Sequence, residues 1–175
     1  ISCEETFNIK LSLTASPDIV SNPTDIVLLL DRSQSMAGSP LANLKNGVKK
    51  FIDIIADATG GTQDGQIGAG SRIGIVSFSN TAVADTQLIT SVADLKASVD
   101  SLRSGGSTNH GDAFTRGMDL FDVQSANARV MVMFTDGETT TGPAPAPIAE
   151  NAKDQGITIF CVVLTGNGGI DGQAL

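Results

Sequence analysis

Oxygen-bearing side chains directly follow a short apolar run near the start of the chain. Asp31, Ser33 and Ser35 come after the five apolar residues 26–30. A run this short, apolar on both faces, is typical of a strand in the middle of a parallel sheet. Carboxylate and hydroxyl oxygens are hard ligands that suit Mg²⁺, Ca²⁺ or Mn²⁺. The pattern predicts a divalent cation at the carboxyl end of strand 25–31, where open α/β sheets bind their ligands.

Two further loops carry the same kind of side chain. Thr108 lies in Gly-Gly-Ser-Thr-Asn, at the start of a predicted helix, and Asp136 lies in Thr-Asp-Gly, after the apolar run 130–134. Ligand-binding loops of an open α/β sheet lie at the carboxyl ends of its strands, so we expect both loops to converge on Asp31. Any one loop could be a simple cap, because Ser and Asp are common capping residues. The three loops together favour a metal site.

The three motifs, in this order and at this separation, resemble the von Willebrand factor type A (VWA) family over residues 25 to about 165. In that family they form a metal-ion-dependent adhesion site. The resemblance implies that Ser33 and Ser35 ligate the metal through their hydroxyls, that Thr108 adds a third hydroxyl, and that Asp31 and Asp136 act directly or through water. It also implies Mg²⁺, or Mn²⁺ or Ca²⁺, with an open position for an Asp or Glu carboxylate of a protein partner.

Apolar periodicity predicts the elements that carry these loops. Four short apolar runs indicate buried strands, at 25–31, 72–78, 130–134 and 157–164, and weak alternation over 81–89 indicates a short edge strand. Helical spacing indicates helices at about 40–58 with Ser39 as N-cap, from the capping box at Ser91 to near 104, from 107–109 onward, and at about 148–155. Residues 59–71 read as a glycine-rich surface loop. This order favours an α/β fold with a doubly wound, mostly parallel central sheet flanked by helices.

The two ends of the chain complete the predicted organisation. Residues 7–14 alternate apolar and polar, so we expect an extra N-terminal edge strand that pairs with 157–164. We divide the chain into this strand and a linker (1–24), a VWA domain (25–165) and a tail (166–175). The resemblance further implies that the chain stops short of the final helix and strand usual in the fold. Cys3 and Cys161 would then form a disulfide or remain isolated thiols, with Cys161 buried as a small hydrophobe.

Composition excludes several classes of partner. The chain has 175 residues, a net charge of −8 and an isoelectric point of about 4.4. Such acidity argues against nucleic acid and anionic membrane and suits a domain that holds a cation. No apolar run is long enough to insert into a membrane. The absence of Trp and Tyr argues against an aromatic-lined pocket for sugars or bases.

Together these features predict a non-enzymatic, metal-dependent adhesion or protein-interaction module. The motif Asp-Arg-Ser-x-Ser-Met resembles VWA domains of bacterial secreted and surface proteins, which implies an extracellular or cell-surface location and a monomeric module. Arg32, Gln34, His110 and Glu138 are expected on the rim of the site.

Two alternatives remain open. The first is a structural metal-binding domain of a larger surface protein, whose metal only ties loops together. The second is a metal-dependent hydrolase. Asp31 is similar in position to the nucleophile of haloacid dehalogenase-type phosphotransferases, but those need a second Asp where this chain has Ser33. No catalytic residue is therefore predicted.

Overall fold

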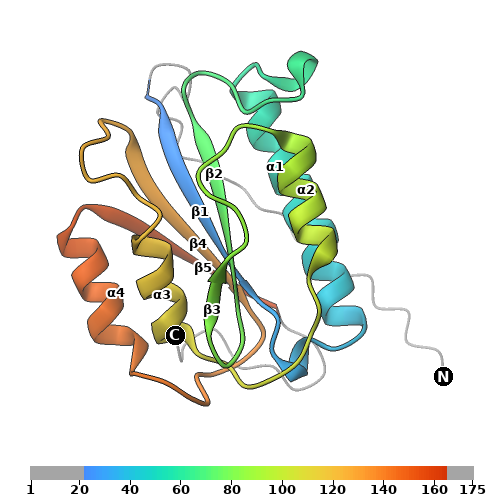
Figure 1. Cartoon of the computed structure of the whole chain (residues 1–175), viewed down its shortest axis with the longest axis vertical. Helices are drawn as coiled ribbons and strands as arrows, with labels where there is room; N and C mark the ends of the chain where they lie inside the picture. Colours follow the sequence, from blue (N-terminus) through green and yellow to red (C-terminus); the bar gives the residue numbers. More distant parts are fainter. Residues whose placement is uncertain (1–21, 165–175) are drawn as a thin grey trace.

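The computed structural model describes residues 22–164, which form one five-stranded sheet in the order β3-β2-β1-β4-β5 (Figure 1). The strands are β1 (Thr24–Asp31), β2 (Arg72–Phe78), β3 (Ala82–Ala84), β4 (Ala128–Thr135) and β5 (Ile157–Val163). The helices are α1 (Ser39–Ala58), α2 (Val92–Ser101), α3 (His110–Met118) and α4 (Pro145–Asp154), with short 3₁₀ turns η1 (Gln34–Met36) and η2 (Thr62–Asp64). All strand pairs are parallel except β2 with β3. The predicted α/β fold is confirmed.

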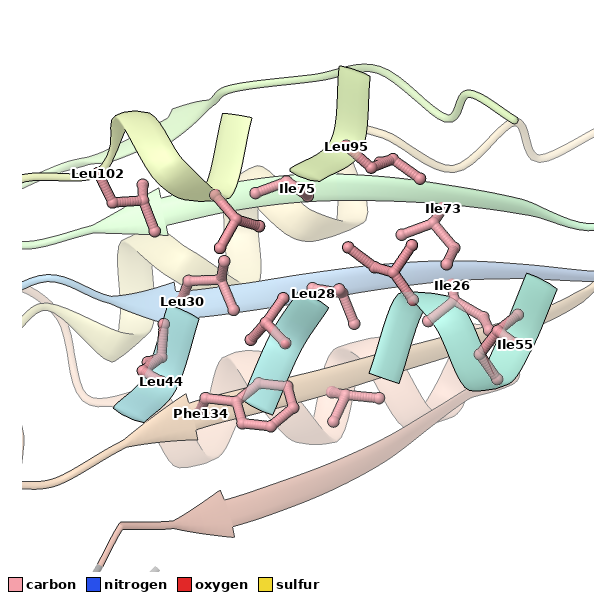
Figure 2. Packing of buried hydrophobic residues seen from close by; sticks show 14 of the residues in the cluster. Ile26, Leu28, Leu30, Leu44, Ile55, Ile73, Ile75, Leu95, Leu102 and Phe134 are labelled. Carbon is pink, nitrogen blue, oxygen red and sulfur yellow. The ribbon is translucent and has the colours of Figure 1, made fainter. Parts of the chain in front are cut away.

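β1 lies at the centre of the sheet because it is apolar on both faces. Leu28 pairs with Ile75 of β2 on one side and with Val132 of β4 on the other. Its even-numbered side chains pack against α1 and α2, as the labelled residues of Figure 2 show, whereas Val27 and Leu29 pack against α3 and α4. Each such buried aliphatic side chain stabilises the fold by about 1.5–3 kcal/mol. The carboxyl end of β1 is thereby fixed in the middle of the molecule.

A buried ion pair fixes the opposite end of β1. The fully buried Asp25 carboxylate accepts hydrogen bonds from Arg72 Nε at 2.9 Å and Arg72 Nη2 at 2.7 Å. It also accepts from Asn127 Nδ2 at 2.9 Å and from Ser125 Oγ at 3.3 Å. Burial alone would raise the pKa of Asp25, but these donors and the Arg72 charge outweigh it and lower the pKa below its ordinary value. The cluster joins the starts of β1, β2 and β4.

Most predicted elements around β1 are confirmed. The helix predicted at 40–58 is α1, although Gly38, with φ of 81°, is its N-cap in place of Ser39. The edge strand predicted within 81–89 is β3, and the Ser91 hydroxyl caps α2 by accepting from Asp94 N at 3.3 Å. The N-cap of α1 lies one residue earlier than predicted because its backbone has a positive φ, which Gly38 adopts without strain and Ser39 would not.

The loop over residues 59–71 is more closely packed than its composition indicated. Ile67 is only 3% exposed and belongs to the core beside α1. The Thr59 hydroxyl accepts from Gly68 N at 2.9 Å, and Gln66 forms a β-bridge with Ser91. The segment is the predicted surface loop over most of its length, with residues 62–66 exposed, but an apolar side chain and a hydrogen bond anchor it to the core.

Two predictions near the end of the chain were also wrong. α4 begins at Pro145, not near 148, since proline in the first helical turn gives up an N–H that has no helical partner. β5 is not the buried strand that was predicted: Phe160 is 53% exposed and Cys161 is exposed. Among residues 22–164, β5 is an edge strand paired only with β4.

The predicted strand 7–14, its pairing with 157–164, the Cys3–Cys161 disulfide and the tail 166–175 fall partly or wholly outside the described residues and stay predictions. So does the division of the chain into three parts. Over residues 22–164, none of the helices has the length and apolarity needed to cross a membrane.

Candidate metal centre

The loop after β1 folds back on itself and brings two hydroxyls together. Asp31 Oδ1 accepts a hydrogen bond from Ser33 N at 2.8 Å, which starts the turn into η1. The Ser33 and Ser35 hydroxyl oxygens then lie 2.9 Å apart. Asp31 and Ser33 are buried, whereas Ser35 is exposed. The loop therefore presents a buried carboxylate and one buried hydroxyl beneath a hydroxyl that a ligand can reach.

Asp136 joins this cluster from the neighbouring strand. Ser35 Oγ donates to Asp136 Oδ1 at 2.8 Å across 101 residues of sequence. The contact forms because β1 and β4 are adjacent and parallel, with Leu30 opposite Phe134, so both strands end at the same edge. Burial and the nearby Asp31 charge raise the pKa of Asp136, although the Ser35 hydrogen bond opposes them. A positive charge at this edge would relieve the repulsion between the two carboxylates.

Thr108 is placed through its backbone. Gly105 N donates to Arg32 O at 2.8 Å, and Gln34 N donates to Gly106 O at 2.9 Å, so the loop before Thr108 lies against the β1–η1 loop. Thr108 N donates to Thr140 Oγ1 at 2.9 Å, and the Thr108 side chain is buried. Within residues 22–164 no hydrogen bond joins its hydroxyl to the other four predicted ligands. Hydrogen bonds connect those four residues to one another, whereas Thr108 lies on the adjoining loop.

The spacing of these oxygens fits a small divalent cation. Neighbouring ligands of an octahedral Mg²⁺ at about 2.1 Å are separated by about 3.0 Å. The Ser33–Ser35 and Ser35–Asp136 oxygen separations of 2.9 and 2.8 Å are close to that value. No group of three or more His, Cys, Asp or Glu side chains in residues 22–164 could hold a metal. Hydroxyl and carboxylate oxygens such as those gathered at this edge suit Mg²⁺, Mn²⁺ or Ca²⁺ better than softer metals.

A hydrogen-bonded chain behind the site was not predicted. Thr135 Oγ1 donates to Asp31 Oδ2 at 2.6 Å, and His110 Nε2 lies 3.0 Å from the same hydroxyl oxygen. The Thr135 proton points to the carboxylate, so His110 Nε2 carries a proton and donates to Thr135. His110 Nδ1 lies 2.7 Å from Thr139 Oγ1, so both ring nitrogens have a hydroxyl partner. Burial lowers the His110 pKa, and the attraction of the Asp31 charge opposes this shift.

The predicted rim is correspondingly revised. His110 is 1% exposed and lies behind the site, so its placement on the rim was wrong. Its ring stacks edge-on against Phe78, with centroids 5.4 Å apart. Arg32 is half-buried, and Gln34 and Glu138 are exposed. The only sequence signal for Thr135 was its place before Asp136 in Thr-Asp-Gly.

Comparison with known proteins identifies the same family as the fold and the three motifs. The model of the von Willebrand factor type A domain matches residues 25–174, and the chain belongs to this family. Members of the family generally mediate adhesion and protein–protein interaction.

A curated relative is the collagen alpha-4(VI) chain of Mus musculus, 27% identical over 144 residues. That match covers 79% of this chain but 6% of the collagen chain, so this sequence corresponds to a small part of the relative.

Solved structures share the fold at lower identity. BatB from Bacteroides thetaiotaomicron has a TM-score of 0.66 at 21% identity, over 80% of this chain and 66% of that one. Proximal thread matrix protein 1 from the mussel byssus, with a zinc-occupied MIDAS motif, has a TM-score of 0.65 at 22% identity, over 80% and 35% of the two chains. The VWF domain of the pilus tip protein Mfa5 from Porphyromonas gingivalis has a TM-score of 0.60 at 19% identity, over 67% and 39%.

Proposed function

We propose that this domain is a divalent-metal-dependent adhesion or protein-interaction module. Ser33, Ser35 and Thr108 would hold the cation through hydroxyl oxygens, with Asp31 and Asp136 acting directly or through water. The observation that carries the proposal is the cluster formed by the Ser33 and Ser35 hydroxyls and the Asp136 carboxylate, at the ligand spacing of a small cation. The occupied MIDAS motif of the mussel protein supports a divalent metal in this fold.

The residues of this chain would prepare the site for an acidic partner. A bound Mg²⁺, Mn²⁺ or Ca²⁺ would supply the positive charge that attracts an Asp or Glu carboxylate of a protein ligand. Neutral hydroxyl ligands leave more of that charge uncompensated than carboxylate ligands would. Thr135 and the Ser33 backbone hold both oxygens of Asp31, so its orientation is fixed before the metal arrives. Exposed Ser35 leaves one side open to the partner.

The site offers little to an enzyme. Both ring nitrogens of His110 are occupied, by Thr135 and Thr139, so the single histidine is not free to act as a general base. We therefore propose a binding module without catalytic residues. We propose an extracellular or cell-surface location for the domain, in a protein secreted by a bacterium. Similar proteins support the location, because they include a collagen chain, a byssus matrix protein and a pilus tip protein. We propose residues 25–165 as the functional unit, acting as a monomer.

An array of matrix and surface proteins tests this function. The domain is applied in Mg²⁺, in Mn²⁺ and with a chelator, beside Ser35→Ala and the control Ser39→Ala, an exposed serine at the start of α1. We expect spots that are lost with chelator and with Ser35→Ala, retained with Ser39→Ala, and lost when carboxylates on the array are amidated. If metal raises the melting temperature but no spot depends on it, the metal is structural and the proposed function is wrong.

A further inference from the structure

A pocket of about 230 Å³ lies beside the candidate metal centre, on the side of the β1–η1 loop that faces β2 and α2. Its lining comes from β2, β3 and the ends of β1 and α2: Arg32, Ser77, Val83, Asp85, Ser101, Leu102 and Arg103. Arg32 stands between Asp31 and Ser33 in the sequence, one Cα step of about 3.8 Å from each. The pocket and the metal centre therefore share the same short loop.

The Arg32 guanidinium is held in place but not neutralised. Its Nε donates to Ser77 Oγ at 3.2 Å, and its backbone is fixed by hydrogen bonds with Phe78 O and Gly105 N at 2.9 and 2.8 Å. Of the ion pairs formed within residues 22–164, none involves Arg32. Its terminal nitrogens remain available to a ligand, at low entropic cost because the side chain is already ordered.

Arg103 adds a second cation from the end of α2. Its Nη1 donates to the carbonyls of Asp100, Ser101 and Leu102 at 3.3, 3.1 and 2.9 Å, which caps the helix. No carboxylate of the described part of the chain pairs with it. The cap orients the guanidinium, and its other nitrogens form no hydrogen bond with residues 22–164. Arginine is suited to this double use because its planar group offers five donors.

The charges around the pocket favour an anion. Among residues 22–164, Asp85 is the only carboxylate that lines the pocket, and its Oδ2 already accepts from Ser77 N at 2.8 Å. Nearby Asp100 is paired with Lys49 at 2.7 Å. Lys45 Nζ caps the same helix end, at 2.8 Å from Leu102 O, and repulsion from Arg103 adds to burial in lowering the Lys45 pKa. A chain with a net charge of −8 thus presents a locally cationic pocket here.

We propose that this pocket binds a second acidic side chain of the protein partner, beside the carboxylate that the metal receives. The inference rests on the proposed function and adds a specificity element to it: the preferred partner segment carries two acidic residues a few positions apart. Arg32 and Arg103 would receive the second carboxylate. Val83, which is 47% exposed at the pocket edge, would contact the aliphatic part of that segment.

Two-dimensional NMR of the isotope-labelled domain with short peptides tests this inference. The probes are blocked glycine-rich peptides with one Asp, with Asp-Gly-Asp or with Asp-Gly-Gly-Asp, each added with Mg²⁺ and with chelator. We expect the one-Asp peptide to shift signals of the metal loops, and a two-Asp peptide to shift Ser77 and Arg103 as well and to bind about two- to fivefold more tightly. The gain should shrink with added salt.

Variants separate this inference from the proposed function. Arg103→Gln should remove the gain from the second Asp and leave the one-Asp peptide unchanged, whereas Arg116→Gln, an exposed arginine on α3, should change neither. If Arg103→Gln lowers the melting temperature, Arg32→Gln provides the same comparison of the two peptides. Mg²⁺ that leaves the metal-loop signals unmoved would contradict the proposed function itself.

Other outcomes overturn the inference alone. Metal-dependent binding of all peptides with equal affinity, or a gain that survives both arginine variants, would show that the pocket takes no second carboxylate. A sulfated disaccharide that shifts the same pocket signals more strongly than the two-Asp peptide, without metal, would assign the pocket to a glycan.

Discussion

We predict that the Thr135 hydroxyl both stabilises the fold and orients Asp31 in the candidate metal centre. It is fully buried, donates to Asp31 at 2.6 Å and accepts from His110. Thr135→Val keeps the branched shape of the side chain but removes these two hydrogen bonds and a longer one from Gly137 N at 3.3 Å. The perturbation therefore acts on polarity with little change in volume.

The expected cost follows from the two groups left without a partner. The lost hydrogen bond to the Asp31 carboxylate is charge-assisted and contributes about 1.5–3 kcal/mol, and a buried His110 N–H without an acceptor costs about 1–3 kcal/mol. Allowing for partial relaxation, we expect Thr135→Val to lower the free energy of unfolding by about 3 kcal/mol. Asp31 would also lose its fixed orientation, so metal affinity should fall about tenfold, as for other residues that orient metal ligands.

Urea unfolding and metal titration measure the two effects. Thr135→Ser retains the hydroxyl and should cost only about 1 kcal/mol for the lost methyl group. Thr115→Val serves as a control, because within the described part of the chain the Thr115 hydroxyl bonds only to Gly111 O of its own helix. It is expected to contribute less than about 0.5 kcal/mol, as at most surface positions. If Thr135→Val and Thr135→Ser are equally stable and bind metal equally, the hydrogen-bonded chain from Asp31 to His110 has no energetic role.

Two further predictions concern the scaffold. Asp25→Asn should lower stability at neutral pH by about 2–3 kcal/mol, since it breaks a buried ion pair whose arginine is partly exposed. Because the fold lowers the Asp25 pKa below 3.8, the stability that this pair gives the wild type is present above that pH and is lost as pH falls through the folded pKa. The free energy of unfolding of Asp25→Asn, measured in urea, should therefore depend less on pH in that acidic range. An acid profile equal to that of the wild type would contradict this. Gly111→Ala should cost about 1–3 kcal/mol, because its Cβ would lie 2.5 Å from Pro143 O, whereas Gly47→Ala in the open middle of α1 should stabilise by about 0.5–1 kcal/mol. Thermal melts that rank the two glycine variants in the opposite order would refute this packing account.

The sequence was most informative where one pattern determines one environment. The apolar run 26–30 identified the central strand because only a strand covered on both faces needs no polar side. Parallel topology then brought Asp31 and Asp136 to one edge, as predicted, because adjacent parallel strands end together. The Ser35–Asp136 contact confirms that the two loops converge.

The remaining features depend on packing that periodicity does not encode. β5 is as apolar as β1, and composition does not distinguish a central strand from an edge strand, so the exposure of Cys161 was missed. Pro145 resembles a helix breaker in sequence, but its effect depends on which turn of the helix it occupies. The burial of His110 follows from how α3 packs on the sheet: His110, the first residue of α3, contacts Thr135 at the end of β4, 25 positions later in the chain.

The pocket beside the site is a further example. Its lining joins the ends of β1 and α2 to residues of β2 and β3, and no single motif contains it. Arg32 attracted notice only as the residue between two predicted ligands. The sequence does not show whether a carboxylate neutralises the Arg32 guanidinium, because that depends on which residues the nearby carboxylates contact in the fold.

Calorimetric titration with Mg²⁺ and Mn²⁺ tests the central claim most directly. The wild type is compared with Ser33→Ala/Ser35→Ala, which retains both carboxylates of the site, and with the control Ser39→Ala. We predict one metal ion per chain in the wild type and the control, and binding in the double variant that is weakened beyond measurement, because the hydroxyls complete the ligand shell. Equal metal affinity in the wild type and the double variant would contradict the account.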